Sequence, residues 1–383
     1  MTATSRSRLI SAPWHRHAGA LALVALTLST GASRADAGAA ASGQPAASRA
    51  VVRDAQAAPS ICTKHAAPWG SDGAPATFAR PVRTAQRLAN VLRPGETGCL
   101  RGGTYSDTFD GWVLRVRRGG SAGRRLTIRS YPGERARLVG TVYVPEGSDF
   151  VTLSRLRIEG TGPENTIKVY ATGTILERSE ITNVGRGDSC LILGSASGHG
   201  EAIRVVIRRN RFHDCGSVEH DNKDHAIYVS SASGTRIVGN VFWRTSGYAI
   251  HLYPNARNSW VSHNIVDGGL PSVRGGVLFG GDDDYASSGN VVERNVIAFS
   301  RTYNITSGWE RDAGRGNVAR SNCLWAGKDG NIDPEDGGFE PHANLVAPPM
   351  FFDRDERDYR LRARSRCLPL LGVEAAARLG LTG

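Results

Sequence analysis

A short segment recurs along the middle of the 383-residue chain, and this repeat limits the possible folds more than any other feature. Each copy has alternating apolar residues, and most copies end in Asn followed by two apolar residues. The copies at 151–158, 174–181, 205–212, 235–242, 260–266, 291–297 and 318–324 read VTLSRLRI, TILERSEI, VVIRRNRF, TRIVGNVF, WVSHNIV, VVERNVI and VARSNCL. A fixed phase with spacers of variable length predicts a solenoid whose insertions are confined to its turns.

The copies are too short for helices, and their Val, Ile, Thr and Phe residues alternate with polar residues at a period of two. We therefore expect parallel strands stacked one coil apart, about 4.8 Å along an axis. The aligned turn position holds Leu156, Ser179, Asn210, Asn240, Asn264, Asn295 and Asn322. We expect these Asn side chains to bond to the next coil and to have a structural role rather than to bind sugar.

A second aligned column precedes the first in each coil, in the runs at 165–170, 189–194, 225–230, 248–253, 275–280 and 303–308. Its period predicts that one set of residues points into the core: Ile167, Leu191, Ile227, Ile250, Val277 and Ile305. The alternate set points outward on one face: Lys168, Ile192, Tyr228, His251, Leu278 and Thr306. We expect Tyr228 and His251 to be neighbours roughly 5 Å apart on this face.

The N-terminus has the pattern of an export signal. Residues 1–17 are basic, residues 18–28 are apolar but too short to span a bilayer, and Ala35-Asp36-Ala37 offers a cleavage site. We predict a signal peptide at 1–37, a flexible leader at 38–60, a folded domain at 61–372 and a C-terminal tail at 373–383. The heavy use of Arg and Ala suggests a GC-rich genome, so we expect a secreted bacterial protein with no membrane association after the signal is removed.

All six cysteines follow the predicted cleavage site, and an even number in an exported chain indicates disulfides. Six cysteines allow fifteen pairings, and the sequence does not choose among them. Our expectation is that neighbouring segments are tied, as Cys62–Cys99, Cys190–Cys215 and Cys323–Cys367. The chain has no C-x-x-C pair, which argues against a zinc site.

With these repeats, the chain resembles the secreted right-handed parallel β-helices of the pectate-lyase-like superfamily. The segment WGSDGAPATFARPVRTAQRLANVLRPGETGCLRGGTY (69–105) is similar to the start of that fold, LTIRSYPGERARLVG (126–140) to its first full coil, and PPMFFDRDERDYRLRARSRC (348–367) to its closing segment. The resemblance implies an all-β, single-stranded solenoid of about eight or more coils, capped by a short helix near 81–93. The superfamily includes lyases, hydrolases, epimerases, tailspikes and structural repeats, so fold alone does not choose a reaction.

The densest group of polar residues is EHDNKDHAIYV (219–229), followed one coil later by His251 and Tyr253. The run DHAIYV resembles a Lys-His-Gly-Ile type run in uronan-acting β-helix proteins, although here Asp224 precedes His225 and Lys223 stands one place earlier. We expect the insertions at 194–204, 214–224 and 268–276 to wall a groove beside this group. Asp188 aligns with Asp224 one coil away.

We expect a lyase, or an epimerase, that acts on an acidic, uronate-containing polysaccharide by proton abstraction, and a lyase would use this group as follows. A base removes the proton beside the carboxylate, and an acid protonates the leaving oxygen. Our candidates are Lys223 or His225 as the base and Tyr228 or His251 as the acid. Arginines, or calcium held by Asp188 and Asp224, would neutralise the carboxylate. We expect Tyr253, Trp309 and Arg311 to bind substrate.

Other functions remain open. Asp188 and Asp224 could instead serve as the paired carboxylates of a glycoside hydrolase, although the polygalacturonase motif series is absent. The chain could also be a non-catalytic polysaccharide- or surface-binding β-helix, or a purely structural repeat. The net charge of +11 suits an acidic polysaccharide. Nucleic acid is a poor alternative, because the basic residues form no aromatic-interleaved patch. We expect a monomer with no cofactor other than calcium.

Overall fold

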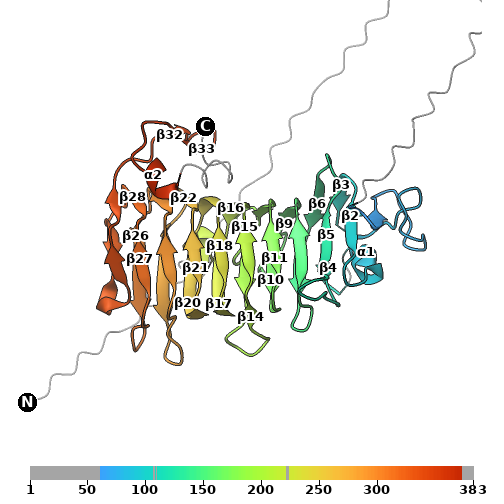
Figure 1. Ribbon diagram of the computed structural model, residues 1–383, viewed down its shortest axis with the longest axis horizontal. Helices are drawn as coiled ribbons and strands as arrows, with labels where there is room; N and C mark the ends of the chain where they lie inside the picture. Colours follow the sequence, from blue (N-terminus) through green and yellow to red (C-terminus); the bar gives the residue numbers. More distant parts are fainter. Residues whose placement is uncertain (1–60, 107, 109, 221–223, 373–383) are drawn as a thin grey trace, which may run out of the picture. The chain divides into compact units, whose positions relative to one another are not determined.

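The computed structural model describes residues 61–106, 108, 110–220 and 224–372. Three parallel sheets, which we call A, B and C, wind around one core in about nine turns (Figure 1). The predicted parallel β-helix is therefore confirmed. The predicted signal peptide, leader and tail, together with Lys223, lie outside the described residues.

Each coil runs from sheet A to sheet B to sheet C before the chain returns to sheet A. Sheet A contains β1 (Lys64–Ala66), β2 (Thr97–Leu100), β5 (Leu126–Ser130), β8 (Val151–Ser154), β11 (Ile175–Glu177), β15 (Val206–Arg208), β18 (Arg236–Val238), β21 (Trp260–Ser262), β24 (Val291–Glu293), β27 (Val318–Arg320) and β30 (Glu340–His342). Sheet B contains β3 (Gly103–Tyr105), β6 (Ala136–Val139), β9 (Arg157–Glu159), β12 (Glu180–Thr182), β16 (Arg211–Cys215), β19 (Val241–Thr245), β22 (Ile265–Asp267), β25 (Val296–Ala298), β28 (Cys323–Trp325) and β31 (Leu345–Val346).

Sheet C carries the outward-facing column identified in the sequence. It contains β4 (Trp112–Arg115), β7 (Thr141–Val144), β10 (Ile167–Val169), β13 (Leu191–Leu193), β14 (Ala202–Ile203), β17 (Ile227–Ser233), β20 (Ile250–Arg257), β23 (Val277–Gly281), β26 (Tyr303–Trp309) and β29 (Gly330–Asp333). The pairing of β17 with β20 sets Ile227 beside Ile250 in the core and Tyr228 beside His251 on the outer face, as the alternation predicted.

The Asn column forms a ladder at the corner between sheets A and B. Each Asn accepts the backbone N–H of its counterpart in the preceding coil and donates to a carbonyl there. The ladder runs from Ser179 to Asn344, one coil beyond the predicted end. A second, shorter ladder of Ser259, Asn290 and Asn317 lies at the corner between sheets C and A. Both ladders satisfy buried amides where the chain turns.

The first coils are closed by helix α1 (Ala85–Val91), which lies within the range predicted for a capping helix. Thr84 caps the helix by accepting the N–H of Arg87, as expected for a threonine at an N-terminus. Leu88 and Leu92 pack directly over Gly98 of β2, where a Cβ atom would lie 2.8 Å from Leu92. Glycine is therefore required for the helix to approach the open end of the core.

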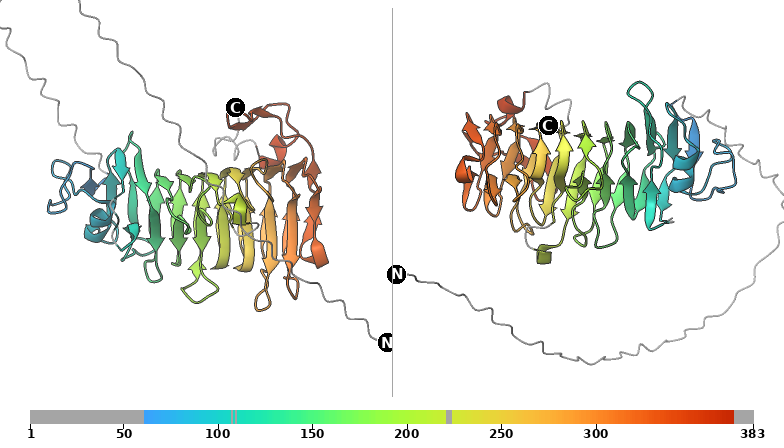
Figure 2. Two further views of the ribbon diagram at one scale, coloured as in Figure 1. Left: turned by 180° about the vertical axis from the view of Figure 1, so that it is seen from behind. Right: turned by 90° about the horizontal axis from the view of Figure 1, so that it is seen from below.

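The closing segment forms a hairpin of β32 (Phe351–Asp353) and β33 (Asp358–Leu361), followed by helix α2 (Leu368–Leu371). It covers the outer side of the last coils (Figure 2), where Tyr359 and Leu361 pack against Trp243 and Ile265 of sheet B. Short 3-10 turns occur at η1 (Val218–His220) and η2 (Glu335–Gly337).

Three disulfides form with the pairing that we expected: Cys62–Cys99, Cys190–Cys215 and Cys323–Cys367. The first ties the start of the described chain to β2, and the last ties β28 to the residue before α2. The middle disulfide joins two adjacent coils at the corner between sheets B and C. No helix in the described part of the chain is long and apolar enough to cross a membrane.

Candidate functional site

The corner between sheets B and C carries two of the three predicted insertions. Residues 216–226 separate β16 from β17, and residues 268–276 separate β22 from β23. The coil between them has a short turn, 246–249, between β19 and β20. Long turns therefore flank a short one, and His225 and His251 lie at the edge of sheet C beside that short turn. The third insertion, 194–204, lies at the opposite edge of sheet C and contains β14.

His225 and His251 contact each other directly. Nε2 of His225 lies 2.6 Å from Nδ1 of His251. The backbone N–H of Tyr248 donates to Nδ1 of His225 over 3.1 Å. Because a backbone N–H can only donate, a neutral His225 carries its proton on Nε2 and donates it to His251. A neutral His251 must then carry its own proton on Nε2, so both tautomers are fixed by one backbone amide.

Burial keeps both imidazoles neutral. His225 is 1% exposed and His251 is 6% exposed. Burial lowers the pKa of His225 to about 3, and burial together with the charge of His225 lowers the pKa of His251 well below its usual value. The pair is therefore a hydrogen-bond relay of neutral rings at neutral pH.

Two tyrosines stack on His251. The Tyr228 ring lies 5.3 Å from the His251 ring, and the Tyr253 ring lies 5.0 Å from it, both nearly parallel to it. Burial raises the pKa of the Tyr228 hydroxyl. Burial and a 2.8 Å hydrogen bond to Glu310 raise the pKa of Tyr253. Both tyrosines are half-buried and keep their protons at neutral pH. Because the hydroxyl of Tyr253 already donates to Glu310, Tyr228 is the one suited to donate a hydrogen bond or a proton.

A cluster of three potential metal ligands lies at the same corner. Ligand atoms of Asp188, His220 and Asp224 lie within 4.8 Å of one another. Asp224 is 2% exposed and accepts hydrogen bonds from the N–H of Ser217 and from Nδ1 of His220, each over 2.8 Å. Burial, followed by the charge of Asp224, raises the pKa of Asp188. Two carboxylates held this close create a site that a cation would stabilise.

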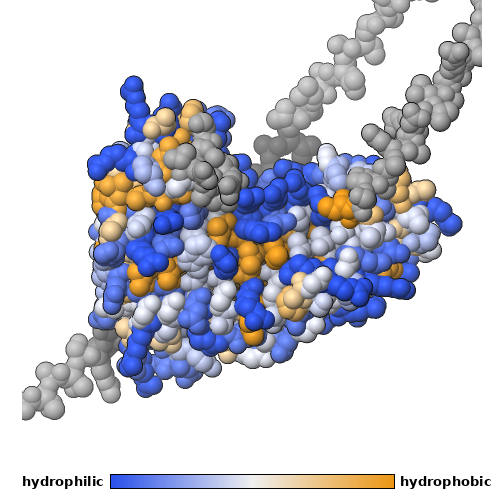
Figure 3. Space-filling model, in the orientation of Figure 1, coloured by the Kyte–Doolittle hydropathy of each residue, from blue (hydrophilic) through white to orange (hydrophobic). Residues whose placement is uncertain are grey.

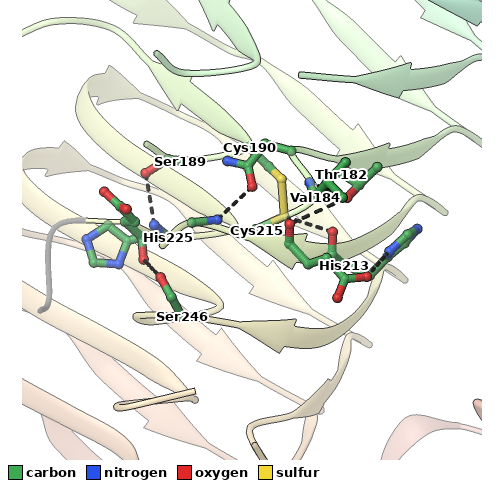
Figure 4. The surroundings of a disulfide bond; sticks show 12 residues. Thr182, Val184, Ser189, Cys190, His213, Cys215, His225 and Ser246 are labelled. Carbon is green, nitrogen blue, oxygen red and sulfur yellow. Dashed lines mark hydrogen bonds and ion pairs between the residues drawn. A yellow bond between two sulfur atoms is a disulfide. The ribbon is translucent and has the colours of Figure 1, made fainter. Parts of the chain in front are cut away.

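The Cys190–Cys215 disulfide supports this corner from behind (Figure 4). The N–H of Cys190 donates to the carbonyl of His225, and the N–H of His225 donates to the hydroxyl of Ser189. The bond therefore fixes the backbone that carries His225 relative to the preceding coil. Rigid support of this kind is what a site of precise geometry requires.

The remaining predicted site residues are farther along sheet C. Trp309 ends β26, and its half-buried ring packs against the core and against Gly338, where a Cβ atom would lie 2.1 Å from its ring nitrogen. Arg311 is exposed and donates to the carbonyl of Asp283. Asp282, in the same turn as Asp283, was not a predicted site residue; it accepts the N–H groups of Asp284 and Tyr285 and so organises that turn.

Sequence reasoning missed three residues of this region. His220 joins the predicted metal ligands Asp188 and Asp224 as a third potential ligand, Glu310 contacts Tyr253, and Tyr248 fixes the tautomer of His225. His220 lies inside the polar run 219–225, so its i, i+4 spacing to Asp224 was a usable signal. Glu310 lies 57 residues from Tyr253, and nothing local in the sequence connects them.

Comparison with known proteins identifies the fold. The family described as "Right handed beta helix region" matches residues 141–307. A pectate lyase, Pel9A, superposes with a TM-score of 0.53 at 14% identity, over 80% of this chain and 91% of that chain. A structure titled rhamnogalacturonan lyase superposes with a TM-score of 0.50 at 15% identity, over 84% of this chain and 99% of that chain. No curated protein matches the sequence. The chain therefore has the right-handed β-helix fold of the pectate-lyase type, and these identities show fold alone.

Proposed function

We propose that this protein is a secreted, carbohydrate-active β-helix protein that acts as a lyase, or an epimerase, on a uronate-containing polysaccharide. The observation that carries the proposal is the neutral His225–His251 relay on the outer face of sheet C, where the His251 ring stacks with both Tyr228 and Tyr253. Groups that keep their protons at neutral pH and face one side of a sheet suit a reaction that develops negative charge on a sugar carboxylate.

In this proposal the residues have distinct parts. A base removes the proton beside the carboxylate, the electron pair moves into the carboxylate, and the bond to the leaving oxygen breaks. Tyr228 donates its proton to that oxygen. His251 donates a hydrogen bond from Nε2 to the developing enolate, because a neutral imidazole is a good donor that needs no prior protonation. Epimerisation would need the same first step and return of the proton to the opposite face.

The proposed reaction also needs a base to remove the proton beside the carboxylate. Both ring nitrogens of His225 are engaged, so in this proposal His225 positions His251. Lys223 remains our expected base. It immediately precedes Asp224 in the chain but lies outside the described residues.

The cluster of Asp188, His220 and Asp224 suits a divalent cation, because two carboxylates and an imidazole lie within 4.8 Å of one another. A bound cation would neutralise the substrate carboxylate. Calcium prefers oxygen ligands, so the carboxylates of Asp188 and Asp224 fit the expected calcium while the imidazole of His220 favours a transition metal. As the paired carboxylates of a hydrolase, these two residues are less suitable, since Asp224 is almost fully buried and already accepts two hydrogen bonds.

The test is to incubate the protein with polygalacturonate, alginate, hyaluronan, heparin and xanthan, with calcium or with chelator, and to follow the ultraviolet absorbance of unsaturated uronate. Reducing ends and C5 configuration are measured in parallel. We expect absorbance to rise and to be lost in Tyr228→Phe and His251→Gln. Matched controls are Tyr143→Phe, three coils away on the same face, and His263→Gln, at the corner between sheets A and B. Reducing ends without absorbance would contradict the lyase and point to hydrolysis.

A second candidate function is non-catalytic binding of a polysaccharide. It is favoured by the low exposure of His251, which limits access of a substrate to its ring. If Tyr228→Phe and His251→Gln bind polysaccharide as the wild type does, and no product forms on any of the polymers, this second function replaces the first.

A further inference from the structure

A groove with a volume of about 890 Å³ lies at the corner between sheets A and B, a different corner of the coils from the one that carries the His225–His251 pair. Six arginines and two glutamates line it, together with a turn at 131–134. The arginines are Arg129, Arg135, Arg155, Arg178, Arg209 and Arg211. Hydrophilic residues gather along this edge of the middle coils, near the strands labelled β9 and β15 in Figure 1 (Figure 3). The lining has a net charge of +4.

Three of these arginines form a straight row. Arg155, Arg178 and Arg209 directly precede Leu156, Ser179 and Asn210, which occupy the same turn position in successive coils. The pairing of β8 with β11 and of β11 with β15 sets them one coil apart, about 4.8 Å along the axis. Their backbone N–H groups donate to carbonyls of the following coil, at Glu177, Arg208 and Val238. These hydrogen bonds hold the backbone of the three arginines in place.

Placing three arginines in this row has two energetic costs. The three residues have positive φ values of 57°, 51° and 57°, a conformation that costs a residue with a side chain about 1 kcal/mol more than glycine. The next coil has Gly239 at the same position, with φ of 66°, so glycine fits there. Like charges one coil apart also repel each other, and that field helps to lower the pKa of the neighbouring Arg129, after its burial.

The two glutamates of the groove already form ion pairs with arginines outside the row of three. Glu134 binds Arg101 at 2.7 Å, and Glu180 binds Arg135 at 2.8 Å and lies 3.6 Å from Arg157. Within the described part of the chain, Arg155, Arg178 and Arg209 have no ion pair and no side-chain hydrogen bond. Three guanidinium groups thus face the groove with their donors available to an anion.

We infer that this groove binds a linear acidic polysaccharide at a second site, separate from the outer face of sheet C. A chain with one carboxylate per sugar presents charges at a spacing comparable to one coil, so successive carboxylates can meet successive guanidinium groups as paired hydrogen bonds. A nucleic acid fits less well, because its bases would need aromatic platforms between the cations. The inference does not depend on the proposed chemistry at sheet C and holds equally for a non-catalytic protein.

The test compares two triple variants, each of which replaces three arginines at positive φ by glycine and so removes the same charge. The groove variant is Arg155→Gly, Arg178→Gly and Arg209→Gly, which also relieves the positive φ values and so retains the fold. The control is Arg204→Gly, Arg244→Gly and Arg294→Gly, three arginines at positive φ outside the groove, of which Arg244 forms an ion pair with Asp214. Binding is measured by electrophoresis through gels containing polygalacturonate or alginate, over a range of salt concentrations.

We expect the groove variant to bind about tenfold more weakly than the wild type, from the loss of three charge-assisted contacts at or near the surface, with a weaker dependence on salt. The control should stay close to the wild type. Equal losses in both triple variants, or no loss in either, would overturn the site. Competition by single-stranded DNA at equal charge concentration would overturn the assigned ligand class. Loss of lyase activity in Tyr228→Phe with normal gel binding would separate this site from the proposed function, as would normal binding by a wild type that forms no product.

Discussion

Asn264 lies in the middle of the ladder at the corner between sheets A and B, and its replacement by alanine tests how much that ladder stabilises the fold. Its side chain accepts from the backbone N–H and the side-chain amide of Asn240, and donates to the carbonyl of Ile237 and to Asn295. Its exposed fraction is 0%, so water cannot replace these partners. At about 1 kcal/mol for each of these hydrogen bonds, Asn264→Ala should lower the free energy of unfolding by about 4 kcal/mol.

The matched control is Asn344→Ala, at the end of the same ladder. Asn344 accepts from the backbone and side chain of Asn322 and donates to Ala319, but it is half-buried, so water can satisfy the groups left behind. We expect Asn344→Ala to lower the free energy of unfolding by at most about half as much as Asn264→Ala does. Urea denaturation followed by circular dichroism gives the free energy, and native-state hydrogen exchange of the Asn240 amide shows whether the loss is local. Equal destabilisation by both variants, or an unchanged exchange rate of the Asn240 amide, would refute the reasoning that burial decides how much each ladder Asn contributes to the free energy of unfolding.

Three further predictions concern the middle disulfide, the C-terminal hairpin and pH. The double variant Cys190→Ser and Cys215→Ser should have a free energy of unfolding about 3.5 kcal/mol lower than the wild type, because the disulfide closes a loop with a sequence separation of 25. A urea midpoint equal to that of the wild type would contradict this. Arg354→Ala should lower the free energy of unfolding by about 3 kcal/mol, because Arg354 forms two hydrogen bonds of 2.8 and 2.9 Å with the buried carboxylate of Asp267. It should also make the β32–β33 hairpin more sensitive to proteolysis. Protease resistance like that of the wild type would argue against this role. His225 has a pKa of about 3 when folded and 6.5 when unfolded, so the unfolded state binds more protons between these values. Stability should therefore be full above pH 6.5 and fall towards pH 3, by up to about 1.4 kcal/mol per pH unit for this group. Urea midpoints that show the same slope in His225→Asn would rule out this source.

The sequence by itself determined the solenoid, because a β-helix is built from local signals that repeat. The period of two assigned Ile227 and Ile250 to the core and Tyr228 and His251 to the outer face, and the structure agrees. The aligned Asn residues predicted the ladder, since a buried amide at a turn needs a partner in every coil. The sequence left fifteen disulfide pairings open, and the expected one is correct because neighbouring segments of a solenoid are also neighbours in space.

Tertiary structure decided what the outer face can do. The alternation of apolar and polar residues predicts which way a side chain points but not whether other segments bury it. The turn at 246–249 and the neighbouring coils bury His225 and His251, and burial keeps both rings neutral. The partner of Tyr253, Glu310, lies 57 residues away on a turn whose path no periodicity describes. The arginine groove was also visible only in part. Arg155, Arg178 and Arg209 occupy the same place in three repeats, but their lack of partners depends on how the glutamates around them are paired. The repeated pattern determines which residues face the core of each coil. The exposure and the charge partners of the outward-facing side chains depend instead on contacts between coils and turns that are far apart in the sequence.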